Sequence, residues 1–395
     1  MTSPLGLLSG HAARQTVLPI VRPTFPDIIS FADDLQHALA TGQVTNNGPH
    51  VQAFEAELSA YVGTPTLAFS SGQAALMTML AAVDVRGREV IVPSFTFCAT
   101  PHAVAWAGGT PVFADVDPRT LTLDLGEVER LITPRTAAIL GVCVYGIACD
   151  YDGLQALGRC YGVKVLYDSA PAFGTRVAGR PIGGFGDAQI FSFHATKAFA
   201  TMEGGALITN DPALLARADA LRNFGQRQGR AWGAAGLNGK MPEIAAMIGR
   251  RQLPHFDDAL RRRLEVAVRY RDALGRLPGL AFATPPAGQE PIWLYFPVRI
   301  DPHGFGLSRD DVATALAADN VLCRKYFDQP CHLMPAYRNG TSRRLPVTEA
   351  WTTDVLALPV YNDQTDEEIG FIVERIEAIH AQAAEVQRHL RATVA

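Results

Sequence analysis

A lysine ends the segment Phe191-Ser-Phe-His-Ala-Thr-Lys197, which begins as an apolar run typical of a buried strand. An isolated lysine at a strand end is most often solvated. In an environment that lowers its pKa, however, a lysine amine can form a Schiff base with an aldehyde cofactor. Ser192 and Thr196 could bind an anionic group beside it. The glycines of Glu203-Gly-Gly205 would let the backbone pass close to a bulky ligand.

A carboxylate follows a second apolar run, Val165-Leu-Tyr-Asp168. Ligands of open α/β sheets bind beyond the carboxyl ends of the strands, where Asp168 is expected to lie. An aspartate at such a place is often a turn former or a helix cap. It can also pair with the protonated ring nitrogen of pyridoxal phosphate (PLP), which keeps the ring ready to accept electrons. Lys197, 29 residues later and also at a strand end, favours this second interpretation.

A third candidate segment is Ala68-Phe-Ser-Ser-Gly-Gln-Ala-Ala75, which predicts a strand, a tight turn and an apolar helix. The free N–H groups and the dipole at the start of such a helix suit a phosphate group. By itself this pattern is weak, because many strand-to-helix turns bind nothing.

These segments belong to a series of short apolar runs that alternate with helical stretches. Several runs are continuously apolar, as expected for strands that are covered on both faces. The pattern predicts an α/β fold with a mostly parallel central sheet and helices on both faces. The predicted strands are residues 66–69, 89–92, 111–114, 138–144, 163–167, 188–192 and 206–209.

Changes in composition and hydrophobic periodicity along the chain predict three parts. Residues 1–25 contain several prolines and little periodicity, so they form an arm; residues 26–250 form the large domain; and residues 251–395 form a smaller α+β domain. The large domain begins with predicted helices at 31–40 and 50–61. The small domain is expected to contain a strand at 293–300 and helices at 256–277, 308–318 and 365–390.

Composition excludes several classes of protein. The 395 residues carry a net charge of −4 without a basic stripe or a polybasic tail, which argues against nucleic acid and membrane-surface partners. No apolar run approaches the ~18 residues of a membrane span, and the first residues do not resemble a signal peptide. The cysteines show no CxxC pair and no zinc-like spacing, so we expect no metal and buried free thiols in a reducing cytoplasm. They are Cys98, Cys143, Cys149, Cys160, Cys323 and Cys331.

Taken together, the segments resemble the DegT/DnrJ/EryC1/StrS family of sugar aminotransferases, within the fold-type I PLP enzymes. The resemblance covers most of the chain, and the order and spacing of the pieces make it specific. Besides Asp168, the matching pieces are Thr45-Asn-Asn-Gly-Pro-His50, Ser71-Gly72, Pro93-Ser-Phe-Thr-Phe97, Pro111-Val-Phe-Ala-Asp-Val-Asp117, Ser192-Phe-His-Ala-Thr-Lys197, Glu203-Gly-Gly205, Asn223-Phe-Gly225, Gly236-Leu-Asn-Gly-Lys-Met241 and Leu358-Pro359.

The resemblance implies roles for particular residues. Lys197 would form the Schiff base with PLP, Asp168 would pair with the pyridine nitrogen, and Phe97 would stack on the ring face. Asn238 would reach the phosphate of the neighbouring subunit's cofactor, which implies a homodimer with shared active sites. The phosphate of the chain's own cofactor would be held by Gly72, Gln73 and Ser192.

Three positions depart from the family pattern. Gln73 replaces a usual threonine, which removes a hydroxyl from the phosphate site. Pro171 stands where a histidine or glutamine usually lies near the cofactor's phenolic oxygen, and Cys143 replaces a usual histidine. These differences do not change the assignment of PLP as the cofactor. They affect which residues can form hydrogen bonds with its phosphate and its phenolic oxygen.

Two further features are weaker. His194, three residues before the lysine, is more often a local hydrogen-bonding residue than an acid or a base. The segment 324–338 could supply substrate contacts from the small domain. Within it, Arg324 and Arg338 are candidates for binding a nucleotide diphosphate, because guanidinium groups bind phosphates in bidentate fashion. Ordinary surface salt bridges are the alternative for both.

The function implied is a PLP-dependent aminotransferase that moves an amino group from glutamate or glutamine to a nucleotide-linked keto-sugar. Similar enzymes act on cyclitol ketones, so that acceptor stays open, as does an aminohydroxybenzoate synthase. Dehydratases of the family carry histidine in place of the lysine, and Lys197 argues against that reaction. A non-catalytic PLP-binding regulator is a third alternative, although no DNA-binding helix pair is visible.

Overall fold

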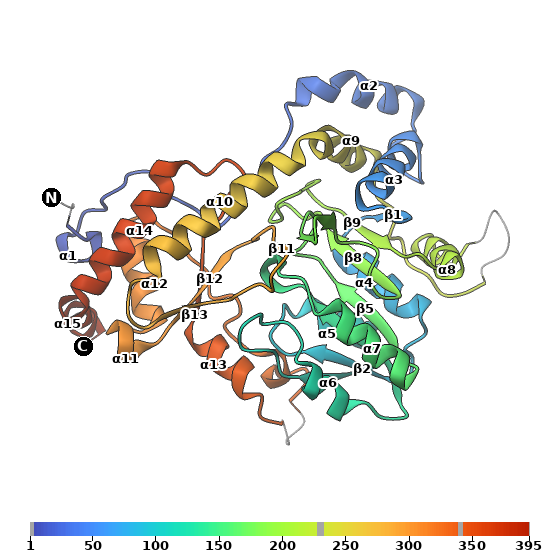
Figure 1. The fold of residues 1–395 in the computed structure, drawn as a ribbon. Helices are drawn as coiled ribbons and strands as arrows, with labels where there is room; N and C mark the ends of the chain where they lie inside the picture. Colours follow the sequence, from blue (N-terminus) through green and yellow to red (C-terminus); the bar gives the residue numbers. More distant parts are fainter. Residues whose placement is uncertain (1–3, 227–232, 339–342, 395) are drawn as a thin grey trace.

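The computed structural model describes residues 4–226, 233–338 and 343–394, and within them a seven-stranded sheet forms the centre of the larger part (Figure 1). The strand order is β1-β9-β8-β5-β4-β2-β3. Only β9 runs antiparallel to its neighbours, so the predicted mostly parallel sheet is confirmed. The strands are β1 (Thr66–Phe69), β2 (Glu89–Pro93), β3 (Thr110–Ala114), β4 (Thr136–Val142), β5 (Lys164–Asp168), β8 (Ala188–Ser192) and β9 (Gly205–Ile208).

Helices cover both faces of this sheet, and the strands are buried on both sides as a result. In β1, Leu67 and Phe69 contribute to one hydrophobic cluster, whereas Ala68 between them contributes to another. This alternation follows from the two-residue period of a strand. The first cluster includes residues of α4 (Gly72–Ala82), α5 (Ala99–Trp106) and α8 (Pro212–Arg222). The second includes residues of α3 (Pro49–Val62), α6 (Leu125–Leu131), α7 (Tyr151–Tyr161) and α9 (Glu243–Gln252).

The C-terminal part is built around a three-stranded antiparallel sheet in the order β10-β12-β13. Its strands are β10 (Leu280–Phe282), β12 (Phe296–Ile300) and β13 (Val355–Leu358). Its helices are α10 (Phe256–Leu274), α11 (Pro302–Phe305), α12 (Arg309–Ala318), α13 (Pro346–Asp354), α14 (Asp366–Ala381) and α15 (Ala383–Val394). A small sheet joins this part to the larger one, because β11 (Gln289–Glu290) pairs with β6 (Arg176–Val177), which pairs with β7 (Arg180–Pro181).

The N-terminal residues pack on the C-terminal part. The short helix α1 (Gly6–Ser9) is tied to the end of α12, where Asp319 Oδ1 accepts a 3.0 Å hydrogen bond from the Gly6 N–H. Leu18 pairs with Val321 in a parallel bridge. Figure 1 accordingly shows both ends of the chain on the same side of the molecule. The domain boundaries stay a prediction, because the core of the C-terminal part also includes Phe95 and Tyr145 from the larger part.

Several predicted bounds are wrong, for identifiable reasons. The predicted strand 138–144 ends at Val142, and the predicted strand 293–300 begins only at Phe296. Tyr145 and Trp293 adopt φ angles of 56° and 46°, which no strand can continue through. The predicted helix 365–390 is two helices, because α14 ends and α15 begins on either side of Gln382.

Other bounds agree closely with expectation. α2 (Ala32–Thr41) and α3 match the helices predicted at 31–40 and 50–61. α12 begins after Ser308, which caps it in a capping box with Asp311. The helix predicted at 256–277 ends at Leu274. In the described ranges, no helix is both long and apolar enough to traverse a lipid bilayer.

Asp115, just after β3, fixes the start of α13 against the larger part. Its carboxylate accepts hydrogen bonds from the Val347 N–H (2.9 Å), the Thr348 N–H (2.8 Å) and the Thr348 hydroxyl (2.7 Å). The same carboxylate also accepts a 3.0 Å hydrogen bond from the Val116 N–H, and because it is buried, removing it leaves four donors without an acceptor.

Asp115→Ala should therefore lower the free energy of unfolding by about 3 kcal/mol. Urea denaturation followed by fluorescence measures this loss. The matched control is Asp272→Ala, which removes an exposed carboxylate on α10 and should change stability by less than about 0.5 kcal/mol. Equal effects of the two substitutions would contradict the assignment.

Candidate active site

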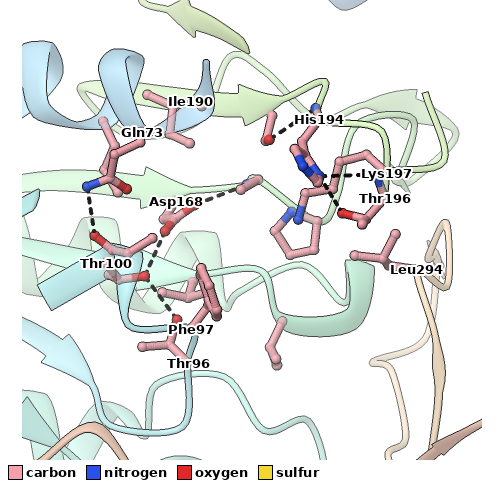
Figure 2. Close-up of a pocket in the computed structure, with 18 of the residues that line it drawn as sticks. Gln73, Thr96, Phe97, Thr100, Asp168, Ile190, His194, Thr196, Lys197 and Leu294 are labelled. Carbon is pink, nitrogen blue, oxygen red and sulfur yellow. Dashed lines mark hydrogen bonds between the residues drawn. The ribbon is translucent and has the colours of Figure 1, made fainter. Parts of the chain in front are cut away.

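A cavity of about 580 Å³ opens at the carboxyl edge of the central sheet. This is the edge where ligands of parallel α/β sheets bind. Its wall includes Asp168 at the end of β5 and Ser192 at the end of β8. Lys197 lies in the loop after β8, so the structure brings the lysine and the aspartate of the sequence analysis into one cavity (Figure 2).

The Asp168 carboxylate is buried and held by two donors. Its Oδ2 accepts a 2.7 Å hydrogen bond from the Thr100 hydroxyl, and its Oδ1 accepts a 3.1 Å bond from the Ala170 N–H. Since the Thr100 hydrogen is given to Asp168, the 2.9 Å contact between Thr96 and Thr100 has Thr96 as its donor. Figure 2 shows this chain of hydroxyls leading to the carboxylate. Burial raises the pKa of Asp168, while the two hydrogen bonds and the charge of Lys197 oppose the rise.

Lys197 faces the cavity with an unusually acidic amine. Burial lowers its pKa from 10.5 to about 8, and the charge of Asp168 only partly offsets this effect. Within the described parts of the chain, no side chain or carbonyl accepts a hydrogen bond from Nζ. The amine is therefore free to react, and near neutral pH a useful fraction of it is unprotonated.

The start of α4 forms another wall. Ser71 caps the helix by accepting a 3.0 Å hydrogen bond from the Ala74 N–H, while no described group accepts from the N–H groups of Gly72 and Gln73. Ser192 lies against this turn so closely that a Cβ on Gly72 would come within 2.6 Å of the serine Cβ. Open N–H donors beside a hydroxyl at a helix start suit a phosphate.

Phe97 lines the cavity from the loop between β2 and α5, and 57% of it is exposed. The ring is thus available to cover the face of a flat ligand. Another part of the wall comes from the C-terminal part and from the turn after β4; the sequence indicated only the segment 324–338 as a source of contacts there, and Tyr145 and Tyr295 were missed. Its aromatic members are Tyr145, Tyr295, Tyr326 and Phe327.

His194 behaves as the local hydrogen-bonding residue that was expected. Its Nδ1 accepts a 3.1 Å hydrogen bond from the Thr196 N–H and lies 2.9 Å from the Thr196 hydroxyl. When the imidazole is neutral, its proton is therefore on Nε2, which faces Glu203 at 3.5 Å.

Three predicted site residues lie outside the cavity wall. Arg324 and Arg338 are exposed on the C-terminal part, so their binding of a nucleotide stays a prediction. Asn238 accepts a 2.6 Å hydrogen bond from Lys240 and also lines no part of the cavity. Its expected contact was with a neighbouring subunit's cofactor, and that expectation stays a prediction as well.

The three departures from the family pattern have distinct surroundings. The Gln73 amide donates a long 3.4 Å hydrogen bond to the Ala99 carbonyl, and its buried Oε1 has no described partner. Pro171 lines the cavity, and its side chain has no polar atom. Cys143 lies outside the wall, buried with its sulfur 3.9 Å from the Cys149 sulfur and 3.3 Å from the Ser169 hydroxyl.

The cysteines are free, as expected, but they are not uniformly buried. Cys160 is exposed, which corrects the expectation for that residue. It lies on the amphipathic helix α7, whose apolar face is supplied by other residues such as Leu154.

The groups around the cavity fit PLP. A phosphate matches the open N–H groups at the start of α4, and a protonated ring nitrogen matches the buried carboxylate of Asp168. An aldehyde matches the free amine of Lys197, whose lowered pKa favours its nucleophilic form. No other ligand class is required to explain the combination of a buried carboxylate, a free amine and a helix start.

Thr100→Val should lower the free energy of unfolding by about 2 kcal/mol, because the buried Asp168 carboxylate loses a hydrogen-bond donor. Urea denaturation at neutral pH measures the loss. The control is Thr78→Val on α4, which removes an equally buried hydroxyl that has no described partner. That substitution should be neutral or stabilising, and a similar loss in both variants would refute the role of the bond.

Comparison with known proteins identifies the family. The model of the DegT/DnrJ/EryC1/StrS aminotransferase family matches residues 29–377. The chain is 35% identical over 357 residues to the dTDP-4-amino-4,6-dideoxy-D-glucose transaminase of Escherichia coli, covering 89% of this chain and 95% of that protein. It is 34% identical to the GDP-perosamine synthase of Caulobacter vibrioides over 357 residues, covering 88% and 94% of the two chains.

Solved structures agree with this result. The crystal structure of DesI with its TDP-sugar product superposes with a TM-score of 0.92 and 37% identity, covering 98% of this chain and 99% of DesI. The Streptococcus pneumoniae protein Spr1654 in its PLP form superposes with a TM-score of 0.84 and 26% identity, covering 93% of this chain and all of that one (100%). The chain belongs to the DegT/DnrJ/EryC1/StrS aminotransferase family and is a PLP-dependent aminotransferase.

Proposed function

We propose that this enzyme transfers an amino group from glutamate or glutamine to a nucleotide-linked keto-sugar, and so makes an amino-deoxysugar. The observation that carries the proposal is the free, acidic amine of Lys197 in the same cavity as the buried carboxylate of Asp168. The names of the relatives support the acceptor class, since they act on dTDP- and GDP-linked amino sugars.

Bound PLP supplies an electron-withdrawing ring and carries the amino group between the two substrates. Lys197 would hold the cofactor through its aldehyde, and its amine would be the group that accepts and returns a proton at the reacting carbon. Its pKa near 8 suits both halves of that task, because the amine can accept and return a proton near neutral pH. Asp168 keeps the proton on the ring nitrogen.

The remaining residues hold and cover the cofactor. The N–H groups of Gly72 and Gln73, together with the Ser192 hydroxyl, bind the phosphate. Phe97 covers one face of the ring and excludes water from it.

The assembly we propose is a homodimer in the cytoplasm. Asn238 of each subunit then reaches the phosphate of the cofactor in its neighbour. Its position outside the cavity of its own chain is compatible with that role.

In the presence of PLP and glutamate alone, the protein should form 2-oxoglutarate in an amount equal to the bound cofactor and then stop. A coupled assay for 2-oxoglutarate, run beside the visible absorption of the cofactor, measures this single turnover. Adding a dTDP-linked 4-keto-6-deoxyhexose should restore continuous turnover. Restoration by a cyclitol ketone instead would replace the proposed acceptor by the cyclitol alternative.

Lys197→Ala should abolish the reaction with glutamate, whereas Lys164→Ala should not change it, because Lys164 forms an exposed ion pair with Asp187. A wild-type protein that binds PLP and leaves both glutamate and glutamine untouched would favour a non-catalytic regulator. One that ignores PLP would overturn the proposal altogether.

The uptake of PLP by the apoprotein should depend on pH through Lys197. The neutral amine is the nucleophile, and lowering its pKa from 10.5 to about 8 raises the neutral fraction at pH 7 by about 300-fold. The uptake rate should rise with pH and reach half of its maximum near pH 8. Stopped-flow absorbance at constant ionic strength measures it, and a profile that still rises steeply beyond pH 10 would contradict the lowered pKa.

A further inference from the structure

Residues 331–337, which precede Arg338, contact the larger part of the molecule. They bind the loop that carries Phe97. Cys331 and His332 are buried in the short helix η4 (Cys331–Leu333), and the Cys331 N–H donates a 3.1 Å hydrogen bond to the Ser94 carbonyl. Farther along, the Tyr337 hydroxyl lies 2.5 Å from Nδ1 of His102, which lines the cavity.

His332 forms the most specific of these contacts. Its backbone N–H donates to the Ser94 Oγ at 3.0 Å, and its Nδ1 lies 2.7 Å from the same oxygen. Burial lowers the pKa of His332, so the imidazole is neutral near neutral pH. With the Ser94 hydroxyl donating to Nδ1, the ring proton is on Nε2, which faces Glu349 at the start of α13 at 3.5 Å.

The contacts continue from Ser94 to the cofactor cavity. The Cys331 thiol donates a 3.2 Å hydrogen bond to the Thr96 carbonyl, and the Thr96 hydroxyl begins the chain through Thr100 to Asp168. Phe97 is the next residue after this anchored backbone. Its ring is more than half exposed, so its own packing does little to fix its position.

We propose that His332 is a positioning residue for the cofactor: by holding Ser94, it sets the loop that presents Phe97 to the ring. This inference rests on the proposed function only in taking Phe97 as a cofactor contact. His332 touches neither the cavity nor a substrate, and it acts through a loop of the larger part while belonging to the C-terminal part. It thereby makes the cofactor pocket dependent on the docking of the two parts.

Two near-isosteric substitutions test the contacts of the two imidazole nitrogen atoms one at a time. In His332→Asn the amide oxygen takes the place of Nδ1 and still accepts from Ser94. In His332→Gln the amide nitrogen takes the place of Nε2 and still faces Glu349, but the Ser94 hydroxyl loses its acceptor. The proposal requires that Asn preserves the wild-type pocket and that Gln does not.

The measurement is a PLP titration of the full-length apoprotein, with the dissociation constant taken from visible absorbance. The visible circular dichroism of the bound cofactor reports the asymmetric contacts of its ring. We expect His332→Gln to weaken PLP binding about tenfold and to change the dichroism, while His332→Asn stays within about twofold of wild type. Urea denaturation of the apoproteins controls for a purely structural effect, which would lower stability without altering the dichroism of the cofactor that still binds.

A double-mutant cycle with Phe97→Ala tests the route of the effect. If His332 acts through Phe97, His332→Gln should weaken PLP binding much less in the Phe97→Ala background than in the wild type. Additive losses, or equal binding by the Asn and Gln variants, would overturn the proposal. A wild-type protein that does not bind PLP would instead overturn the proposed function, so the two failures are distinguishable.

Discussion

The burial of two opposite charges at one edge of the sheet is the constraint on which the site depends. Asp168 is buried and Lys197 is partly buried, and for both residues the loss of water disfavours the charged form. Their mutual attraction offsets only part of that cost. The fold holds both groups in place, because Asp168 ends β5 and Lys197 lies in the loop after β8. A ligand that can interact with both poorly solvated groups is therefore favoured at this edge.

Close backbone packing gives this charged edge its shape. Gly205 in β9 approaches the start of α4 so closely that a Cβ there would lie 2.6 Å from the Gly72 nitrogen. Gly72 in turn leaves no room for a side chain against Ser192. The start of α4 can therefore lie directly against the paired strands β8 and β9, which are far from it in sequence, and small residues are the physical condition for this close approach.

Much of the fold and of the cofactor side of the site could be predicted from the sequence. β1 and β8 begin and end where their apolar runs do, because strands buried on both faces have few alternatives. The end of β4 could not be predicted, because the residue type of Tyr145 gives no indication that its backbone adopts a left-handed conformation.

The C-terminal wall of the cavity could be predicted only in part, because the segment 324–338 was a candidate for contacts but its aromatic residues were not singled out. Tyr295 and Tyr326 stack on each other with ring centroids 5.0 Å apart, and only long-range packing brings them to the cavity. The hydrogen bond between His332 and Ser94 joins residues that are 238 positions apart, and no local sequence pattern indicates it. The arginines that local chemistry singled out, Arg324 and Arg338, lie on the surface instead.

The contact between the N-terminal residues and α12 has a consequence for the order in which the molecule is built. The Gly6 N–H and the Asp319 carboxylate that accepts its hydrogen bond are 313 residues apart in the chain. Domains generally fold in the order in which the ribosome releases them. Here the N-terminal segment cannot form this hydrogen bond until most of the chain, up to Asp319, has been synthesised. The larger part can collapse around its sheet during that interval. The hydrogen bond between Gly6 and Asp319 therefore closes a loop of more than 300 residues, so the N-terminal segment can dock only on a C-terminal part that has already left the ribosome.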